Sequence, residues 1–235
     1  MLPLAVLAGG YATRLGSLTK ETPKCLIEIN GRPFVDWQLE LLMGKGYSDF
    51  IFCVSYKSES IQEYLGDGKS RGANIKYSYD GQTQLGTGGA IKNALPKLGN
   101  AFGVIYGDSY LPTNYLAAEQ EFLSSGSQAL MLVYENLNQF DSSNVEFVKG
   151  KLIKYEKGTR NSDMRHIDYG ITFFRDTAFR LWMDQTSFDL SEVCHQLAKD
   201  NKLDGYEVFE RFYEIGSMRG IEELSQYLRK VSNEL

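Results

Sequence analysis

Hydrophobic and polar positions along the first 134 residues predict strands and helices in alternation. Short apolar runs that end at glycine or polar residues indicate buried strands. Between them, apolar residues recur at the spacing of a helix. The predicted strands are 4–8, 25–29, 49–55, 73–79, 101–106 and 129–134, and the predicted helices are 33–43, 58–65, 88–95 and 112–123. This alternation is typical of an α/β domain with a largely parallel sheet.

The pattern changes after residue 134. Segments 145–148 and 152–155 flank Gly150 and predict a hairpin, and 167–174 predicts a further strand. Helices are predicted at 175–183, 189–200 and 218–230. No repeat or linker interrupts the chain, so the simplest organisation is a single domain, 1–235. In this organisation the mixed second half, 135–235, completes a pocket that 1–134 begins.

Composition and charge exclude several classes of function. Hydrophobic residues make up 43% and charged residues 23%, which suits a globular protein with a core of useful size. A net charge of −5 argues against nucleic-acid binding, which usually needs a basic surface. The three dispersed cysteines and two histidines suggest neither a disulfide framework nor a histidine-rich metal site. Because we find no signal peptide and no membrane-spanning run, we expect a cytoplasmic protein.

A glycine-rich loop with cations follows the first predicted strand. Paired glycines, Gly9 and Gly10, let backbone N–H groups approach a phosphate or a base closely. Arg14 offers a planar fork for phosphate oxygens, and Lys24, after Pro23, adds a compact second charge. The loop has the pattern of neither a P-loop nor a dinucleotide fingerprint. The glycines alone would indicate a tight turn, but with both cations they favour a nucleotide site.

An acidic candidate follows another buried strand. Asp108 comes directly after Gly107, at the end where open α/β sheets bind their ligands. Magnesium takes one or two protein carboxylates together with substrate phosphates, so Asp108 is a candidate ligand. A second glycine-rich loop, Gly86-Thr87-Gly88-Gly89, precedes a predicted helix. Its glycines leave room for a flat base and Thr87 can bond the edge of that base, although a flexible helix-entry loop would show the same residues.

These segments resemble the sugar-1-phosphate nucleotidyltransferases, in order and over nearly the whole chain. The nearest members are the heptose- or mannose-1-phosphate guanylyltransferases and the muramic-acid-1-phosphate uridylyltransferases. The matching segments are 7–15, 21–26, 86–89, 106–108, 155–157 and 213–216. The resemblance implies a Rossmann-like, mixed but mostly parallel sheet flanked by helices. It also implies a nucleotide-binding half, 1–134, and a sugar-phosphate-binding half, 135–235.

The same resemblance implies a role for each candidate residue. Nucleotide binding would fall to Leu7, Ala8, Gly9, Gly10, Thr13, Leu85, Gly86, Thr87 and Gly88. Sugar phosphate would be held by Glu156, Lys157, Asp168 and Gly170. Catalysis would use Arg14, Lys24 and Asp108, and Mg²⁺ would lie on Asp108 and Glu214. The implied partners are a nucleoside triphosphate, with guanine the first choice and cytosine or uracil the alternative, and a sugar 1-phosphate.

The chain departs from the family pattern at three positions. Ala12 stands where many members have glycine, Gly16 where many have a second arginine, and Glu214 where an aspartate is usual. Three other functions compete with this interpretation. A choline-phosphate cytidylyltransferase would use an aromatic cage, which the many tyrosines permit, and a nucleotide-sugar sensor could discard the cations that are present here. A sugar transferase would usually carry Asp-x-Asp, which 108–110 lacks.

Overall fold

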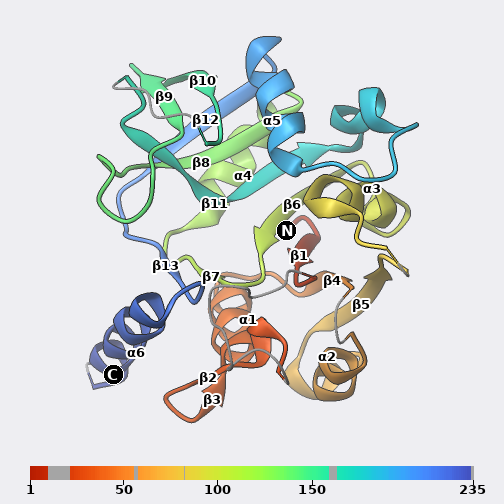
Figure 1. Ribbon diagram of the computed structural model, residues 1–235, viewed down its shortest axis with the longest axis vertical. Coiled ribbons are helices and arrows are strands. Elements are labelled where there is room, and N and C mark those ends of the chain that lie inside the picture. Colours follow the sequence, from red (N-terminus) through yellow and green to blue (C-terminus); the bar gives the residue numbers. More distant parts are fainter. Residues whose placement is uncertain (10–21, 56–57, 82, 159–162, 234–235) are drawn as a thin grey trace.

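Helices cover both faces of a nine-stranded mixed sheet (Figure 1). The computed structural model describes residues 1–9, 22–55, 58–81, 83–158 and 163–233. The architecture confirms the predicted α/β fold, with one mixed sheet flanked by helices in a single domain.

The first half of the chain builds four parallel strands in the spatial order β6-β1-β4-β5. The strands are β1 Leu4–Leu7, β4 Asp49–Val54, β5 Asn74–Tyr79 and β6 Ala101–Tyr106. The helices that connect them are α1 Phe34–Gly44, α2 Ser58–Leu65 and α3 Gly86–Leu98. The hydrophobic pattern predicts each strand. β1, β4 and β6 are nearly continuous apolar runs, as is usual for strands covered on both faces, whereas β5 alternates between exposed and more buried residues.

Alternating side chains on these strands divide the core into two layers. On β1, Leu4 and Val6 belong to the layer under α1, α2 and α4 (Tyr115–Ser124). Ala5 belongs to the opposite layer, under α3 and α5 (Leu190–Lys199). Both layers consist mainly of buried side chains, so the sheet is packed from two sides.

The second half extends the sheet through β11 (His166–Arg175), which runs antiparallel to β6 on one side and to β8 (Ala129–Glu135) on the other. The predicted hairpin is present as β9 (Val145–Val148) and β10 (Lys151–Tyr155). The hydrophobic pattern does not predict β12 (Leu203–Val208), which lies parallel to β8.

Two predicted elements have a different form. Segment 25–29 is not one strand but a 3-10 turn, Lys24–Leu26, followed by the two-residue strand β2 (Glu28–Ile29). β2 pairs with β3 (Arg32–Pro33) around Asn30-Gly31, where both residues have the positive φ that a two-residue hairpin requires. Segment 175–183 is a 3-10 helix, η4 (Asp176–Trp182), rather than an α-helix. A further 3-10 turn, η3, spans Lys69–Arg71.

The last helix forms a third, smaller core with elements from the beginning of the chain. α6 (Met218–Asn233) contributes Leu224 and Leu228, which pack in one cluster with Ile29 and Phe34. The side-chain oxygen of Asn30, in the turn between β2 and β3, accepts hydrogen bonds from Ser225 and Arg229 of α6, at 2.7 and 3.0 Å. The β2–β3 hairpin, which follows the Lys24 turn, is therefore anchored by residues about 200 positions later, because Asn30 and Arg229 are 199 residues apart.

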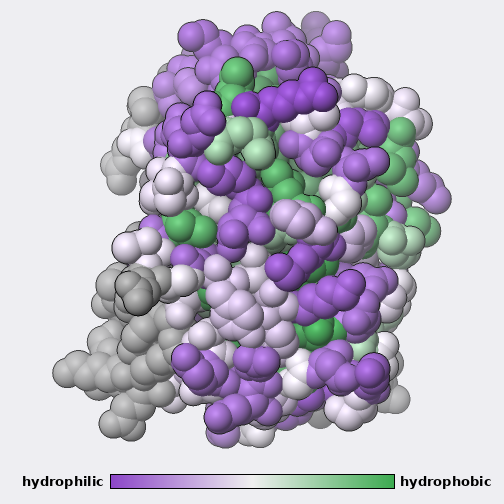
Figure 2. Space-filling model, turned by 90° about the vertical axis from the view of Figure 1, so that its right-hand side faces the viewer, coloured by the Kyte–Doolittle hydropathy of each residue, from purple (hydrophilic) through white to green (hydrophobic). Residues whose placement is uncertain are grey.

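The next feature is the polarity of the molecular surface. The face shown in Figure 2 is mostly hydrophilic, with hydrophobic side chains in separate patches. Among the residues that the structure describes, no helix is both long and apolar enough to cross a bilayer.

Candidate functional site

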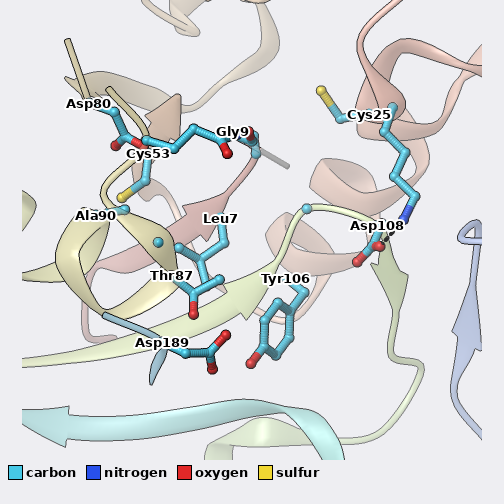
Figure 3. A pocket seen from close by; sticks show the side chains of 15 residues that line it. Leu7, Gly9, Cys25, Cys53, Asp80, Thr87, Ala90, Tyr106, Asp108 and Asp189 are labelled. Atoms are coloured by element: carbon cyan, nitrogen blue, oxygen red, sulfur yellow. Dashed lines mark hydrogen bonds and ion pairs between the residues drawn. The ribbon is translucent and has the colours of Figure 1, made fainter. Parts of the chain in front are cut away.

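A pocket of about 390 Å³ opens where the parallel strands β1, β4, β5 and β6 end (Figure 3). The residues that line it are Leu7, Ala8, Gly9, Lys24, Cys25, Cys53, Asp80, Gln84, Gly86, Thr87, Ala90, Tyr106, Gly107, Asp108 and Asp189. Among these described residues, only Asp189 comes from beyond residue 134. The pocket lies at the sheet edge that the sequence predicts, and its volume suits a small ligand.

One end of the pocket holds an ion pair between Lys24 and Asp108, which are 84 residues apart in the chain. Asp108 follows β6 and is succeeded by β7 (Ser109–Tyr110), which pairs antiparallel with β13 (Tyr213–Glu214). The Ile215 N–H donates to the carbonyl oxygen of Asp108, at 3.0 Å. This small ladder brings the Glu214 segment beside Asp108, so two sequence-predicted metal ligands and one predicted catalytic cation meet here.

The electrostatics of this end suit a divalent cation. Part of the Glu214 side chain is exposed, yet partial removal from water and then the negative charge of Asp108 raise its pKa to about 7, while Lys24 acts in the opposite sense. Two carboxylates that repel each other are the oxygen donors that magnesium takes with substrate phosphates. No group of three or more such acidic, cysteine or histidine side chains is found in the described part of the chain. The donor set therefore fits a magnesium ion whose remaining ligands come from substrate and water.

The second glycine-rich segment, Gly86 to Gly89, is not a loop before the helix but the first turn of α3. It forms one wall of the pocket, and its glycines have a packing role. A Cβ atom at Gly86 would lie 2.5 Å from the carbonyl oxygen of Phe188, and one at Gly88 would lie 2.4 Å from the Phe188 ring. The Gly88 N–H donates to that carbonyl oxygen, at 3.0 Å. The Thr87 hydroxyl oxygen accepts a hydrogen bond from the Leu190 N–H, at 2.8 Å, and keeps its own proton to donate. Gly86 and Thr87 line the pocket, whereas the predicted nucleotide-binding residue Gly88 does not. Close approach to the 186–190 segment explains the glycines.

The strand-end loop after β1 is also shaped by contact with a neighbouring strand end. The Ser55 hydroxyl donates to the Gly9 carbonyl oxygen at 2.6 Å, and a Cβ atom at Gly9 would lie 2.7 Å from that hydroxyl. Leu7 and Ala8 line the pocket beside Gly9. Gly10, Thr13 and Arg14, together with the departures at Ala12 and Gly16, lie outside the described residues.

The predicted sugar-phosphate residues are only partly brought together. Lys157 lies 3.5 Å from Asp189, measured between Nζ and Oδ2, and this contact places Lys157 at the rim of the pocket. Glu156 instead pairs with Lys154 at 2.8 Å and borders a separate hollow beside Trp182. The structure therefore does not bring Glu156 to the main pocket.

Asp168 and Gly170 lie on β11 at an irregularity in its pairing with β8. Gly170 has φ +106°, and its N–H donates to the Asp168 carboxylate at 2.9 Å. Burial raises the pKa of Asp168 to about 6, with Lys157 acting in the opposite sense. Neither residue lines the main pocket, and the Leu85 side chain does not line it either.

Four polar residues that line the pocket were not among the predicted site residues: Asp80, Gln84, Tyr106 and Asp189. Asp80 follows β5 just as Asp108 follows β6, so the end of a parallel strand was an available signal. Asp189 caps α5 in a capping box with Glu192, a motif visible in the sequence. Tyr106 is the last residue of β6, and burial raises the pKa of its hydroxyl well above the ordinary value. Figure 3 shows Tyr106 and Asp189 along the same side of the pocket.

Comparison with known proteins gives matches over nearly all of the chain. A family model described as nucleotidyl transferase matches residues 5–231. The chain is 37% identical over 136 residues to a D-glycero-alpha-D-manno-heptose 1-phosphate guanylyltransferase from Campylobacter jejuni, covering 58% of each chain. It is 36% identical over 116 residues to an N-acetylmuramate alpha-1-phosphate uridylyltransferase from Neisseria meningitidis, covering 49% of this chain and 50% of the relative. The chain thus spans about half the length of these curated relatives.

Solved structures show the same fold at low sequence identity. The inositol-1-phosphate CTP transferase from T. maritima superposes with a TM-score of 0.82 at 19% identity. The superposition covers 98% of this chain and 96% of that one. At this identity the likeness concerns the fold alone.

Proposed function

Because the chain belongs to the nucleotidyl transferase family, we propose that it transfers a nucleoside monophosphate from a nucleoside triphosphate to a sugar 1-phosphate, with release of pyrophosphate. One observation carries the proposal: Lys24, Asp108 and the Glu214 segment meet at one end of a pocket at the carboxyl edge of the sheet. Relatives named as heptose and mannose guanylyltransferases support GTP with heptose or mannose 1-phosphate as the substrates.

The reaction asks the protein for position and charge rather than covalent chemistry. The sugar phosphate oxygen attacks the α-phosphorus, and pyrophosphate leaves from the opposite side. The attacking oxygen is already anionic at neutral pH, so no general base is required. Lys24 exchanges Asp108 for the α-phosphate and stabilises the negative charge that develops there. Lys157, at the rim, orients the attacking phosphate.

Asp108 and Glu214 are the residues that would hold magnesium. When bound, the ion supplies positive charge and Lewis acidity to the reacting phosphates. The release of Asp108 from Lys24 and the approach of Glu214 are the contributions of the chain itself. Arg14, which the sequence assigns to the triphosphate tail, completes the set of cations in this proposal.

The pocket favours a sugar phosphate over phosphocholine. A quaternary ammonium is held by several aromatic faces, whereas the described lining contains a single aromatic residue, Tyr106. A uridylyl- or cytidylyltransferase remains the nearest alternative, since one relative is named as a uridylyltransferase.

The test is a matrix of the four triphosphates against heptose, mannose, glucose and N-acetylmuramate 1-phosphates and phosphocholine, followed by pyrophosphate release with magnesium. We expect release only when both substrates are present, and we expect Asp108→Asn to abolish it. Asp49→Asn, at the opposite end of β4, is the matched control and should retain it. Nucleotide binding without pyrophosphate release for any acceptor would contradict the proposal and favour a sensor.

A further inference from the structure

The carboxylate of Asp80 lies at the end of the pocket opposite the Lys24–Asp108 pair. We propose that Asp80 recognises guanine, by accepting hydrogen bonds from the N1–H and N2 amino groups of the base. This assignment rests on the proposed function, because it takes the ligand to be a nucleotide with its phosphates at Lys24.

The sheet order fixes the distance between the two ends. Asp108 follows β6 and Asp80 follows β5, and β1 and β4 lie between these two strands. Three interstrand spacings of about 4.8 Å separate the strand ends by roughly 14 Å, the scale of an extended nucleotide. Figure 3 shows Asp80 and Asp108 at opposite sides of the same pocket. A nucleotide with its α-phosphate at Lys24 therefore directs its base toward Asp80.

The walls near Asp80 suit a flat, mostly apolar ring. Cys53 and Ala90 lie on the same side of the pocket as Asp80 in Figure 3, and Leu7 also lines the pocket. Burial raises the pKa of the Cys53 thiol to about 12, with the nearby Asp80 charge as the second cause, so this thiol is neutral and packs as an apolar group. A carboxylate among such groups can give orientation and specificity to the ligand, beside the polar side chains of Gln84 and Thr87 that also line the pocket.

Asp80 has unused capacity to accept hydrogen bonds. Its Oδ2 atom accepts from the Leu85 N–H at 3.3 Å, and no lysine or arginine of the described residues forms an ion pair with it. A carboxylate has about four acceptor sites, so several remain. The side chain is half-buried, and burial raises its pKa, which shows that the charge is poorly solvated. Donors from a ligand would stabilise that charge.

Guanine is the nucleobase whose pairing edge matches a carboxylate. It presents two adjacent donors, N1–H and the N2 amine, in the forked arrangement that carboxylates bind well. Uracil presents one donor between two acceptors, while adenine and cytosine each place an acceptor next to their single amino group. Those acceptors would face the negative charge. A site built to bond two donors rejects bases that lack them.

The competing explanation is that Asp80 only closes the turn to Leu85. Asp80→Asn separates the two roles, because the amide carbonyl still accepts the Leu85 N–H while the amide nitrogen now presents donors to the base. Asp80→Ser is a second variant that also keeps a short acceptor for the turn. Asp49→Asn removes an equivalent charge at the opposite edge of the sheet and serves as the matched control.

The experiment measures equilibrium binding of GTP, ITP, UTP, CTP and ATP by calorimetry, with magnesium and without sugar phosphate. ITP lacks only the N2 amine, and a hydrogen bond to a charged group changes affinity about tenfold to a hundredfold. We expect the native protein to bind GTP more tightly than ITP by that factor, and UTP, CTP and ATP more weakly still. In Asp80→Asn and Asp80→Ser the GTP-to-ITP ratio should approach one, with melting temperatures near that of the native protein.

Three binding results would contradict the role of Asp80 in guanine recognition. Equal affinity of the native protein for GTP and ITP, tighter binding of UTP or CTP, or a GTP preference that persists in both variants would overturn the assignment. Because binding is measured without an acceptor, failure of nucleotidyl transfer would leave this result readable. A loss of the GTP preference in Asp49→Asn would show that the effect is general rather than specific to Asp80.

Discussion

Replacing Gly86 by alanine tests how tightly the pocket wall is built. Gly86 has φ +70°, and an added Cβ atom would lie 2.5 Å from the Phe188 carbonyl oxygen. An L-residue in this left-handed region costs about 1–2 kcal/mol. Overpacking against a buried neighbour adds about 1–3 kcal/mol. The lower entropy of the unfolded alanine chain offsets about 0.4–1 kcal/mol.

We therefore expect Gly86→Ala to lower the free energy of unfolding by about 2–4 kcal/mol, as measured by urea denaturation. A shift of 1 kcal/mol changes the melting temperature of a domain this size by about 2–4 °C, so the melting point should fall by roughly 4–16 °C. The slope of the denaturation curve should stay the same, because the surface exposed on unfolding does not change.

Two further variants separate the cost of the left-handed backbone from the cost of overpacking. Gly72 has φ +79° and no atom within 4 Å of an added Cβ, so Gly72→Ala reports the backbone cost alone and should lose about 1 kcal/mol or less. An added Cβ at Gly88 would lie 2.4 Å from the Phe188 ring. Gly88 lies within α3, and inside a helix alanine is favoured over glycine by about 1 kcal/mol. Gly88→Ala should thus cost less than Gly86→Ala.

Shortening Phe188 distinguishes a ring contact from a backbone contact. Phe188→Leu should reduce the cost of Gly88→Ala, because the clash there is with the ring, but it should leave the cost of Gly86→Ala unchanged. If Gly86→Ala is no more destabilising than Gly72→Ala, or if Phe188→Leu rescues it, the reasoning about this wall is wrong.

Four other expectations follow from the charged groups. Lys24→Ala should lower turnover about a hundredfold or more, whereas the exposed Lys97→Ala should not, and near-normal turnover of a folded Lys24→Ala protein would exclude the role. Magnesium should be required and Asp108→Asn nearly inactive; full activity in chelator would contradict the metal assignment. Glu214→Gln should raise the magnesium concentration for half-maximal activity while leaving metal-free thermal stability almost unchanged, and an unaltered requirement would make Glu214 a bystander. Because the folded-state pKa of Asp168 is raised to about 6, ionising this carboxyl opposes folding, and the free energy of unfolding should fall as pH rises from about 4 to 6. Asp168→Asn should remove this pH dependence of the free energy of unfolding, measured by urea denaturation. An identical pH dependence in the variant would refute the raised pKa.

The parallel half of the fold was predictable because β1, β4 and β6 are buried on both faces and β5 shows a regular polar–apolar alternation. β12 was not, since Asp204 and Glu207 interrupt the apolar pattern, and the strand pairs only with β8 at the edge of the sheet. An edge strand with polar side chains carries little hydrophobic signal, so its existence depends on the ladder that β8 offers.

The site was predictable where one segment carries the chemistry and less so where segments meet. The strand ends identified Asp108, but its ion pair with Lys24 joins positions 84 residues apart and exists only through the fold. Asp189 gives an ordinary helix-capping signal, and it lines the pocket because Phe188 packs on the glycines of the opposite loop. Glu156 shows the reverse, since the segment that carries it borders a separate hollow and its side chain pairs with Lys154.

The third core has a consequence for synthesis on the ribosome. Ile29 and Phe34 emerge early, but their partners Leu224 and Leu228 on α6 are made about 190 residues later. At a translation rate of roughly 5–20 residues per second, these apolar side chains stay without their α6 partners for about 10–40 seconds. During that time the nascent chain exposes a hydrophobic surface next to the Lys24 turn. Slow translation of the last helix should therefore increase chaperone capture of the nascent protein.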